Sequence, residues 1–256
     1  MRTSVAWWCL EGLGLDADGI VRAAVDAGCG GVEMAGEEHW PRLREAGLAI
    51  AAERGHASLE VGLNRPAEHD RIEREILANL RLAQEWGIST LICFSGNRDG
   101  MPDDEGAEHT AVGLRRVAQA AEDAGVTLAV ELLNSKVDHP DYQCDRTAWG
   151  TRVIDAVGSP RVKLLYDAYH MQIMEGDVIR TLTANAGRIG HYHVAGNPGR
   201  NEPDATQELN YPPIYRAIAA TGFDGWIGME FIPRGEPGAA LRAAVEDVRS
   251  ARGGAT

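Results

Sequence analysis

Short apolar segments alternate with amphipathic segments along the whole chain, and this alternation predicts its elements. The amphipathic segments carry apolar residues at helical spacing, whereas the short apolar runs are typical of strands. Strands are expected within residues 4–9, 31–36, 48–59, 89–96, 127–133, 162–170, 189–196 and 226–232. Strands that alternate with helices indicate right-handed βαβ units and a parallel sheet.

The helices expected between these strands have recognisable ends. Asp16 is a candidate N-cap for the first helix, and Gly87 is a candidate stop for the long helix of residues 69–86. Other helices are expected at about 40–46, up to about Gly125, up to Val157, and at about 176–186, 214–221 and 241–248. Three polar, turn-rich segments, 97–109, 134–148 and 197–213, are expected to be long loops.

The number of strand–helix units predicts the fold class. Eight such units in 256 residues favour a closed (β/α)8 TIM barrel over an open doubly wound sheet. We expect residues 1–256 to form a single barrel domain, since α/β barrels commonly reach this length as one unit. The sequence has no GxGxxG after its first strand and no GxxxxGK[ST] segment, so dinucleotide and P-loop folds lack their fingerprints.

Composition limits the partners that we expect. The net charge of −13 argues against nucleic acid, because binding to phosphate backbones depends on clustered Lys and Arg. No apolar run approaches the length of a membrane span, and the N-terminal segment does not resemble a signal peptide. The four cysteines form no CxxC pair and are expected to be buried free thiols. These features indicate a cytoplasmic protein.

Four polar residues each end an apolar run in the second half of the chain. They are Glu131, Asp167, His193 and Glu230, spaced by roughly one strand–helix unit. In a (β/α)8 barrel the ends of successive strands face one mouth, where active sites lie. Each residue taken alone could be a core His or an ion-paired acid, but the set of four favours one divalent metal ion. Three carboxylates and an imidazole suit Mg²⁺, Mn²⁺ or Co²⁺ better than structural zinc.

Four segments together resemble the hydroxypyruvate isomerase branch of the xylose isomerase-like (β/α)8 proteins. They are VELLNSK, LLYDAYHMQIMEGD, GHYHVAGNPGRNEPD with ELNYP, and WIGMEFIP. The resemblance implies that Glu131, Asp167, His193 and Glu230 bind the metal and that Glu131 and Glu230 also transfer a proton. It implies that His170 contacts a substrate oxygen and that the protein assembles as a dimer or tetramer. The third ligand is Gln in some hydroxypyruvate isomerases, whereas this chain has His193.

Further polar residues are candidates for the same mouth. Arg200 could clamp an anion or hydroxyl of the substrate, because a guanidinium binds a carboxylate bidentately. His56 could line the mouth as a substrate contact, and Glu33 could orient its neighbours. Lys136 is expected to be exposed, and one of two adjacent residues, Trp7 and Trp8, is expected to line the mouth.

The leading hypothesis is a metal-dependent isomerase that interconverts a small hydroxy-aldehyde and hydroxy-ketone, of the hydroxypyruvate and tartronate semialdehyde type. Two glutamates would move a proton next to a carbonyl through an enediolate. A ketose 3-epimerase or inosose-type sugar isomerase on the same site is the alternative. A DNA-repair endonuclease would need more metal ligands and a basic groove, and a non-catalytic sugar-binding barrel would not need an intact ligand set.

Overall fold

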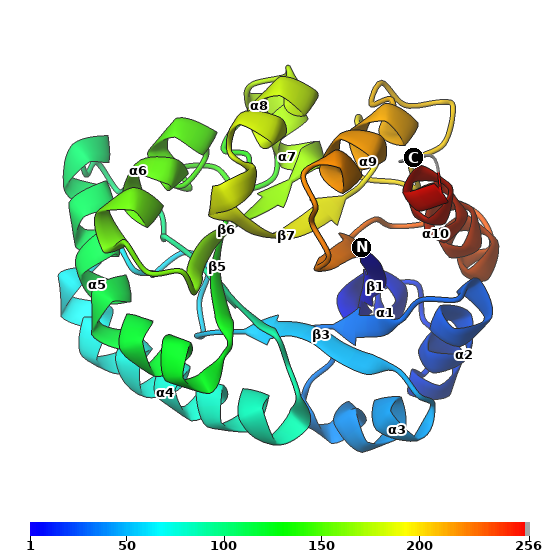
Figure 1. Cartoon of the computed structure of the whole chain (residues 1–256), viewed down its shortest axis with the longest axis horizontal. Helices are drawn as coiled ribbons and strands as arrows, with labels where there is room; N and C mark the ends of the chain where they lie inside the picture. Colours follow the sequence, from blue (N-terminus) through cyan, green and yellow to red (C-terminus); the bar gives the residue numbers. More distant parts are fainter. Residues whose placement is uncertain (254–256) are drawn as a thin grey trace. The chain divides into compact units, whose positions relative to one another are not determined.

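The computed structural model describes residues 1–253, with side chains described up to residue 251. Within these residues, eight parallel strands form a closed barrel in sequence order, and helices lie between them in the chain. This architecture confirms the prediction of a (β/α)8 TIM barrel. The elements can be followed in chain order from blue to red in Figure 1.

The strands have the following bounds: β1 Arg2–Ala6, β2 Gly31–Glu33, β3 Ala49–Arg54, β4 Thr90–Cys93, β5 Thr127–Glu131, β6 Val162–Asp167, β7 Ile189–Val194 and β8 Trp226–Met229. The α-helices are α1 Trp7–Glu11, α2 Ala17–Ala27, α3 Trp40–Glu45, α4 His69–Trp86, α5 Asp103–Ala124, α6 Thr147–Val157, α7 Ala168–Met174, α8 Val178–Ala184, α9 Tyr211–Ala220 and α10 Pro237–Gly253. Short 3₁₀ helices are η1 Glu37–His39, η2 Pro66–Glu68 and η3 Ala186–Arg188.

The described residues divide into two compact units. In the unit of residues 1–53, 177–186 and 192–253, β1 pairs in parallel with both β2 and β8, and α10 packs against α2 and α9. In the unit of residues 54–176 and 187–191, β5 pairs in parallel with β4 and β6. Its helices α4, α5 and α6 pack side by side in that order (Figure 1). The organisation of the chain as a single domain stays a prediction.

Several helix ends lie where the sequence placed them. The side chain of Asp16 accepts a hydrogen bond from Gly19 N at 2.7 Å and so caps α2. Gly87 follows α4 with φ of 74°, a left-handed conformation that a glycine adopts without steric cost. Gly125 and Gly158 end α5 and α6 in the same way.

Two predicted strands are shorter than expected because a helix begins directly at their ends. The run of residues 4–9 was expected to be one strand, but Trp7 opens α1, and its Nε1 donates to Glu11 Oε1 one turn later at 3.3 Å. The run 162–170 ends at Asp167, whose Oδ1 accepts bonds from Tyr169 N and His170 N and thereby caps α7. Apolar periodicity cannot separate a short strand from a strand that continues as a buried helix.

The segment of residues 97–109 was expected to be a loop, but α5 begins within it at Asp103. Three acidic residues, Asp103, Asp104 and Glu105, occupy the first turn, where negative charge interacts favourably with the helix dipole. Pro102 at the N-cap position marks the same boundary. The polar composition that predicted a loop therefore belongs to a helix start.

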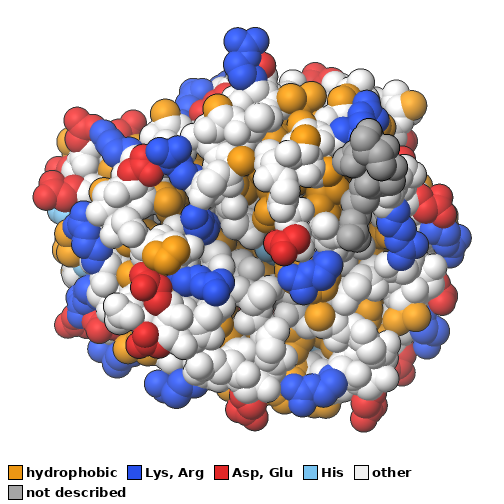
Figure 2. Space-filling view, in the orientation of Figure 1, with side chains coloured by type: hydrophobic (Ala, Val, Ile, Leu, Met, Phe, Trp, Pro, Cys, Tyr) orange, Lys and Arg blue, Asp and Glu red, His pale blue; other side chains and the backbone are white. Residues whose placement is uncertain are grey.

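The thiols and the surface agree with the composition. Across the described residues, the four cysteines are buried and form no disulfide bond, as expected, and burial raises the pKa of Cys29 and Cys93 to about 12. Acidic and basic side chains are interspersed over the face shown in Figure 2. No helix within residues 1–253 is long and apolar enough to cross a bilayer.

Candidate active site

His193 is oriented by a buried carboxylate. Its Nε2 lies 2.9 Å from Glu33 Oε2, and Ser4 Oγ donates to the other oxygen of Glu33. A carboxylate accepts the bond from Nε2–H, which leaves Nδ1 of His193 as the ring atom with a lone pair for a metal. Nδ1 lies 3.4 Å from Glu230 Oε2. Glu33 thus orients its neighbour His193.

A glycine on β8 leaves room for this pair. His193 lies opposite Gly228 in the parallel pairing of β7 with β8. A Cβ at Gly228 would lie 2.6 Å from Glu33 Oε1 and 2.7 Å from His193 Cδ2. Any larger residue would therefore displace the hydrogen-bonded pair, and this explains a glycine in the interior of a strand.

Glu230 follows β8 directly and is held on both of its oxygens. Arg200 Nη2 lies 2.5 Å from Oε2, and Trp8 Nε1 donates to Oε1 at 3.2 Å. The Arg200 guanidinium also lies over the Trp8 ring, 5.1 Å from its centroid. Arg200, predicted to bind an anion or hydroxyl of the substrate, thus binds a carboxylate of the protein, and its contact with substrate stays a prediction. Trp8 is half-buried and Trp7 is buried.

Glu131 and Asp167 end β5 and β6 and are both buried. The hydroxyl of Tyr142 donates to the backbone oxygen of Glu131 at 3.0 Å and accepts a bond from Ser95 N at 3.1 Å. Burial raises the pKa of Tyr142 well above its usual value, so this hydroxyl stays a neutral donor. The loop after β4 therefore supports the end of β5.

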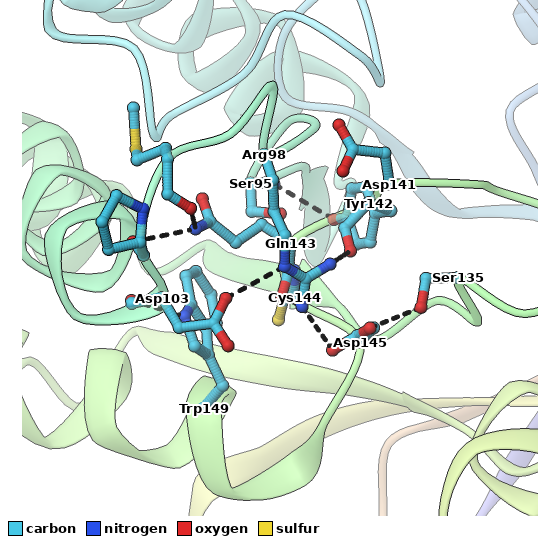
Figure 3. Close-up of polar contacts among 12 residues, drawn as sticks. Ser95, Arg98, Asp103, Ser135, Asp141, Tyr142, Gln143, Cys144, Asp145 and Trp149 are labelled. Atoms are coloured by element: carbon cyan, nitrogen blue, oxygen red, sulfur yellow. Dashed lines mark hydrogen bonds and ion pairs between the residues drawn. The ribbon is translucent and has the colours of Figure 1, made fainter.

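A network of loop residues holds the segment that follows Glu131. Arg98, in the loop after β4, binds Asp103 Oδ1 and Asp145 Oδ1, each at 3.0 Å. Ser135 Oγ donates to the second oxygen of Asp145 at 2.5 Å (Figure 3). Arg98 and Ser135 thus bind the two oxygens of the buried Asp145 carboxylate. Because Arg98 lies after β4 and Asp145 lies after β5, this charged hydrogen bond fixes the two loops to each other.

His170 lies in the first turn of α7, fully buried. Its Nε2 is 3.7 Å from Asp167 Oδ2, and its Nδ1 is 2.6 Å from Asn134 Nδ2. Lys136 is exposed, as expected, and its Nζ donates to Ile173 O at 2.7 Å near the end of α7, where a cation interacts favourably with the helix dipole. Asn134 was not singled out in the sequence, where its only signal is its position three residues after Glu131.

The four predicted ligands are all buried, with exposed fractions of 4% for Glu131, 0% for Asp167, 0% for His193 and 4% for Glu230. Each offers one ligand atom, and these four atoms lie within 4.8 Å of one another. Arg200 compensates one negative charge, that of Glu230, and the remaining negative charge of the three buried carboxylates favours a bound cation. The donor set of oxygens and one imidazole nitrogen fits Mg²⁺, Mn²⁺ or Co²⁺. The cluster could therefore hold a divalent metal ion.

Both ring nitrogens of His56 bond to backbone atoms. Nδ1 lies 2.9 Å from Ala57 O, and Phe94 N donates to Nε2 at 3.0 Å. This pattern corresponds to a neutral ring with its proton on Nδ1, and burial lowers the pKa of His56 below its usual value. The arrangement favours a structural role, and the substrate contact of His56 stays a prediction.

The lowered pKa of His56 predicts a dependence of stability on pH. The unfolded chain binds a proton at His56 below about pH 6.5, whereas the folded chain binds it only at lower pH. The free energy of unfolding, measured with urea, is therefore expected to fall as the pH drops from 7 through this window. His56→Gln should be less stable at pH 7 by about 1–3 kcal/mol, because two buried bonds are altered. Its pH dependence should be shallower than that of the wild type, and parallel curves would contradict the prediction.

Comparison with known proteins agrees with this architecture. The family described as xylose isomerase-like TIM barrel matches residues 21–251. A hydroxypyruvate isomerase of Escherichia coli K12 is 32% identical over 206 residues, which are 80% of this chain and 77% of that protein. A 2-oxo-tetronate isomerase of Cupriavidus necator is 42% identical over 128 residues, 50% of this chain and 48% of that protein. A crystal structure from Brucella melitensis titled AP endonuclease, family 2, superposes with a TM-score of 0.80 at 26% identity, covering 94% of this chain and 97% of that one. The chain therefore belongs to the xylose isomerase-like TIM barrel family.

Proposed function

We propose that the chain is a metal-dependent isomerase that interconverts a small hydroxy-aldehyde and a hydroxy-ketone, of the hydroxypyruvate and tartronate semialdehyde type. The observation that carries this proposal is the group of four buried ligands Glu131, Asp167, His193 and Glu230. Relatives named hydroxypyruvate isomerase and 2-oxo-tetronate isomerase support an enzyme that isomerises a small molecule. A cytoplasmic location and a homodimer or homotetramer remain part of the proposal.

The reaction moves one proton between two adjacent carbons and another between the oxygens that they carry. In our proposal, one of the pair Glu131 and Glu230 removes the carbon proton and the other returns a proton to the neighbouring carbon. A divalent ion held by the four ligands would supply positive charge for the carbonyl and hydroxyl oxygens of the substrate. Arg200 and Trp8 restrict the orientation of Glu230 through their bonds to its two oxygens, so that its carboxylate keeps one position.

The endonuclease alternative is less well supported. A second group, Glu33, His191 and His193, also places potential ligand atoms within 4.8 Å of one another. However, Glu33 Oε2 and His193 Nε2 lie 2.9 Å apart in a hydrogen bond, and His193 also belongs to the first group. A proton lies between the two atoms in such a bond, where a metal would need their lone pairs. The net charge of −13 also disfavours a nucleic-acid substrate.

The epimerase alternative follows from His193 at the third ligand position, where the family resemblance allows either His or Gln. An epimerase would use the same two glutamates to remove and return a proton on one carbon, and the carbonyl would keep its place. The two reactions therefore differ in the position of the carbonyl in the product. This difference makes them separable in one assay.

The Mn²⁺-loaded protein should be incubated in D₂O with hydroxypyruvate, tartronate semialdehyde, ketoses and inososes, and the products examined by NMR and mass spectrometry. We expect deuterium to enter a carbon next to the carbonyl of hydroxypyruvate, together with formation of the aldehyde isomer. The chelated protein is the control and should give the background rate. Labelling of a ketose with inversion at one carbon, and no turnover of hydroxypyruvate, would instead identify an epimerase.

A further inference from the structure

The side-chain amide of Asn134 has only one orientation that its surroundings allow. Its Oδ1 accepts hydrogen bonds from the backbone N–H groups of Val137 at 2.9 Å and Asp138 at 3.0 Å. An amide NH₂ group could not accept these two bonds, so the atom on the other side must be the nitrogen. That nitrogen, Nδ2, lies 2.6 Å from Asp138 Oδ2 and 2.6 Å from His170 Nδ1.

This orientation determines the tautomer of His170. The two hydrogens of Asn134 Nδ2 point to two acceptors, Asp138 Oδ2 and His170 Nδ1. A proton on Nδ1 of His170 would face another N–H at 2.6 Å, which is repulsive. Asp138 Oδ2 could not take that proton instead, because it lies 3.9 Å from Nδ1. His170 is therefore a neutral imidazole whose proton is on Nε2.

The Nε2–H of His170 is next to the proposed metal ligand Asp167. Nε2 lies 3.7 Å from Asp167 Oδ2, while Asp167 Oδ1 accepts the backbone bonds that cap α7. The edges of His139 and Tyr169 pack around the His170 ring, with ring centroids 5.4 Å and 5.1 Å away. The ring is fully buried, so its packing and its bond to Asn134 fix the direction of Nε2–H.

We propose that Asn134 is a positioning residue, which keeps His170 as a neutral Nε2–H donor toward the substrate oxygen that gains negative charge during isomerisation. The chemical role of this donor rests on the proposed function, whereas the tautomer does not. An N–H group placed in advance at a developing oxyanion stabilises it more than solvent does. A ring with the opposite tautomer would present a lone pair to that oxygen and would repel it.

The test exchanges the side-chain amide of Asn134 with the carboxylate of Asp138, which are hydrogen-bonded to each other. In the double variant Asn134→Asp/Asp138→Asn, the carboxylate at position 134 can still accept the backbone bonds of residues 137 and 138, and the amide at position 138 can donate to it. Net charge and composition are unchanged, and the Tyr169 hydroxyl, which donates to Asp138 Oδ2 at 2.8 Å, can accept instead. The group that faces Nδ1 of His170 is now an acceptor. Asp138→Asn alone is the matched control, since it leaves the Asn134 amide in place.

The tautomer is read by NMR of the metal-free protein with ¹⁵N-labelled histidine, and His170→Gln identifies the signals. We expect the proton on Nε2 in the wild type and in Asp138→Asn, and on Nδ1 in the double variant. In the Mn²⁺-loaded enzymes, kcat of the double variant should be lower by about 100-fold with little change in KM. The same tautomer in all three proteins, or an unchanged kcat after the tautomer has reversed, would overturn the proposal. If the wild type shows no isomerase activity, the proposed function fails, yet the NMR result still decides the tautomer.

Discussion

Glu131→Gln and Glu230→Gln are each expected to lower kcat for isomerisation by about 1000-fold or more while the fold is retained. General acid–base groups contribute factors of about 10²–10⁴, and each of these glutamates is also a proposed metal ligand. Gln has nearly the same shape as Glu, but at position 230 its amide oxygen can accept only one of the two bonds that Arg200 and Trp8 make to Glu230, because its NH₂ group is a donor. The loss should come mainly from the missing proton acceptor and from the missing negative charge, and in Glu230→Gln also from one lost hydrogen bond. Steady-state kinetics with hydroxypyruvate measures it.

The metal content of each variant separates these two causes. A variant that keeps its Mn²⁺ and still loses activity has lost the proton transfer, whereas a variant without Mn²⁺ has lost the site. Glu73→Gln is the control, because Glu73 lies on α4 in an ion pair with Arg116. Its kcat should stay within about twofold of the wild type, since surface ion pairs contribute little. Activity near the wild-type level in Glu131→Gln or Glu230→Gln would disprove the two-glutamate mechanism.

The strand-end residues could be identified from the sequence because their signal is local. Glu131 and Asp167 are the last residues of β5 and β6, and each follows an apolar run that predicts a buried strand in this alternating pattern. The repeat of strand and helix then predicts the barrel, and the barrel predicts a common mouth. No single residue had to be placed in three dimensions for this inference.

The contacts that orient the ligands could not be assigned in this way because the two residues of each contact are distant in the sequence. Trp8 and Glu230 are separated by 222 positions, and Glu33 and His193 by 160. Trp8 also lies on a helix that local periodicity assigned to a strand, so the alternation of faces along a strand cannot give its direction. Asn134 is close to Glu131 in the sequence, but its role depends on α7, which packs next to it only in the folded chain.

A chelator is expected to remove the isomerase activity and also to lower the thermal midpoint of unfolding. Glu131, Asp167 and Glu230 are buried, so the folded chain without a cation holds three carboxylates close together with little screening by water. A metal that binds only the folded state stabilises it by about 2.7 kcal/mol at a concentration 100 times its Kd. This corresponds to a midpoint about 5–10 °C higher for a chain of this size. Differential scanning fluorimetry with and without Mn²⁺ measures the shift.

The same measurement on two variants connects the shift to the proposed ligands. Asp167→Asn should abolish most of the Mn²⁺-dependent shift, because it removes a charged ligand, and its metal-free form should be no more repulsive than the wild type. Asp104→Asn removes an exposed carboxylate that pairs with Arg152 and should leave the shift unchanged. Equal shifts in both variants would mean that Mn²⁺ acts through the acidic surface of this chain, whose net charge is −13, and not through the buried cluster. If the Mn²⁺-dependent shift disappears only in Asp167→Asn, the metal binds at the strand ends. The isomerase activity should then depend on the same metal ion.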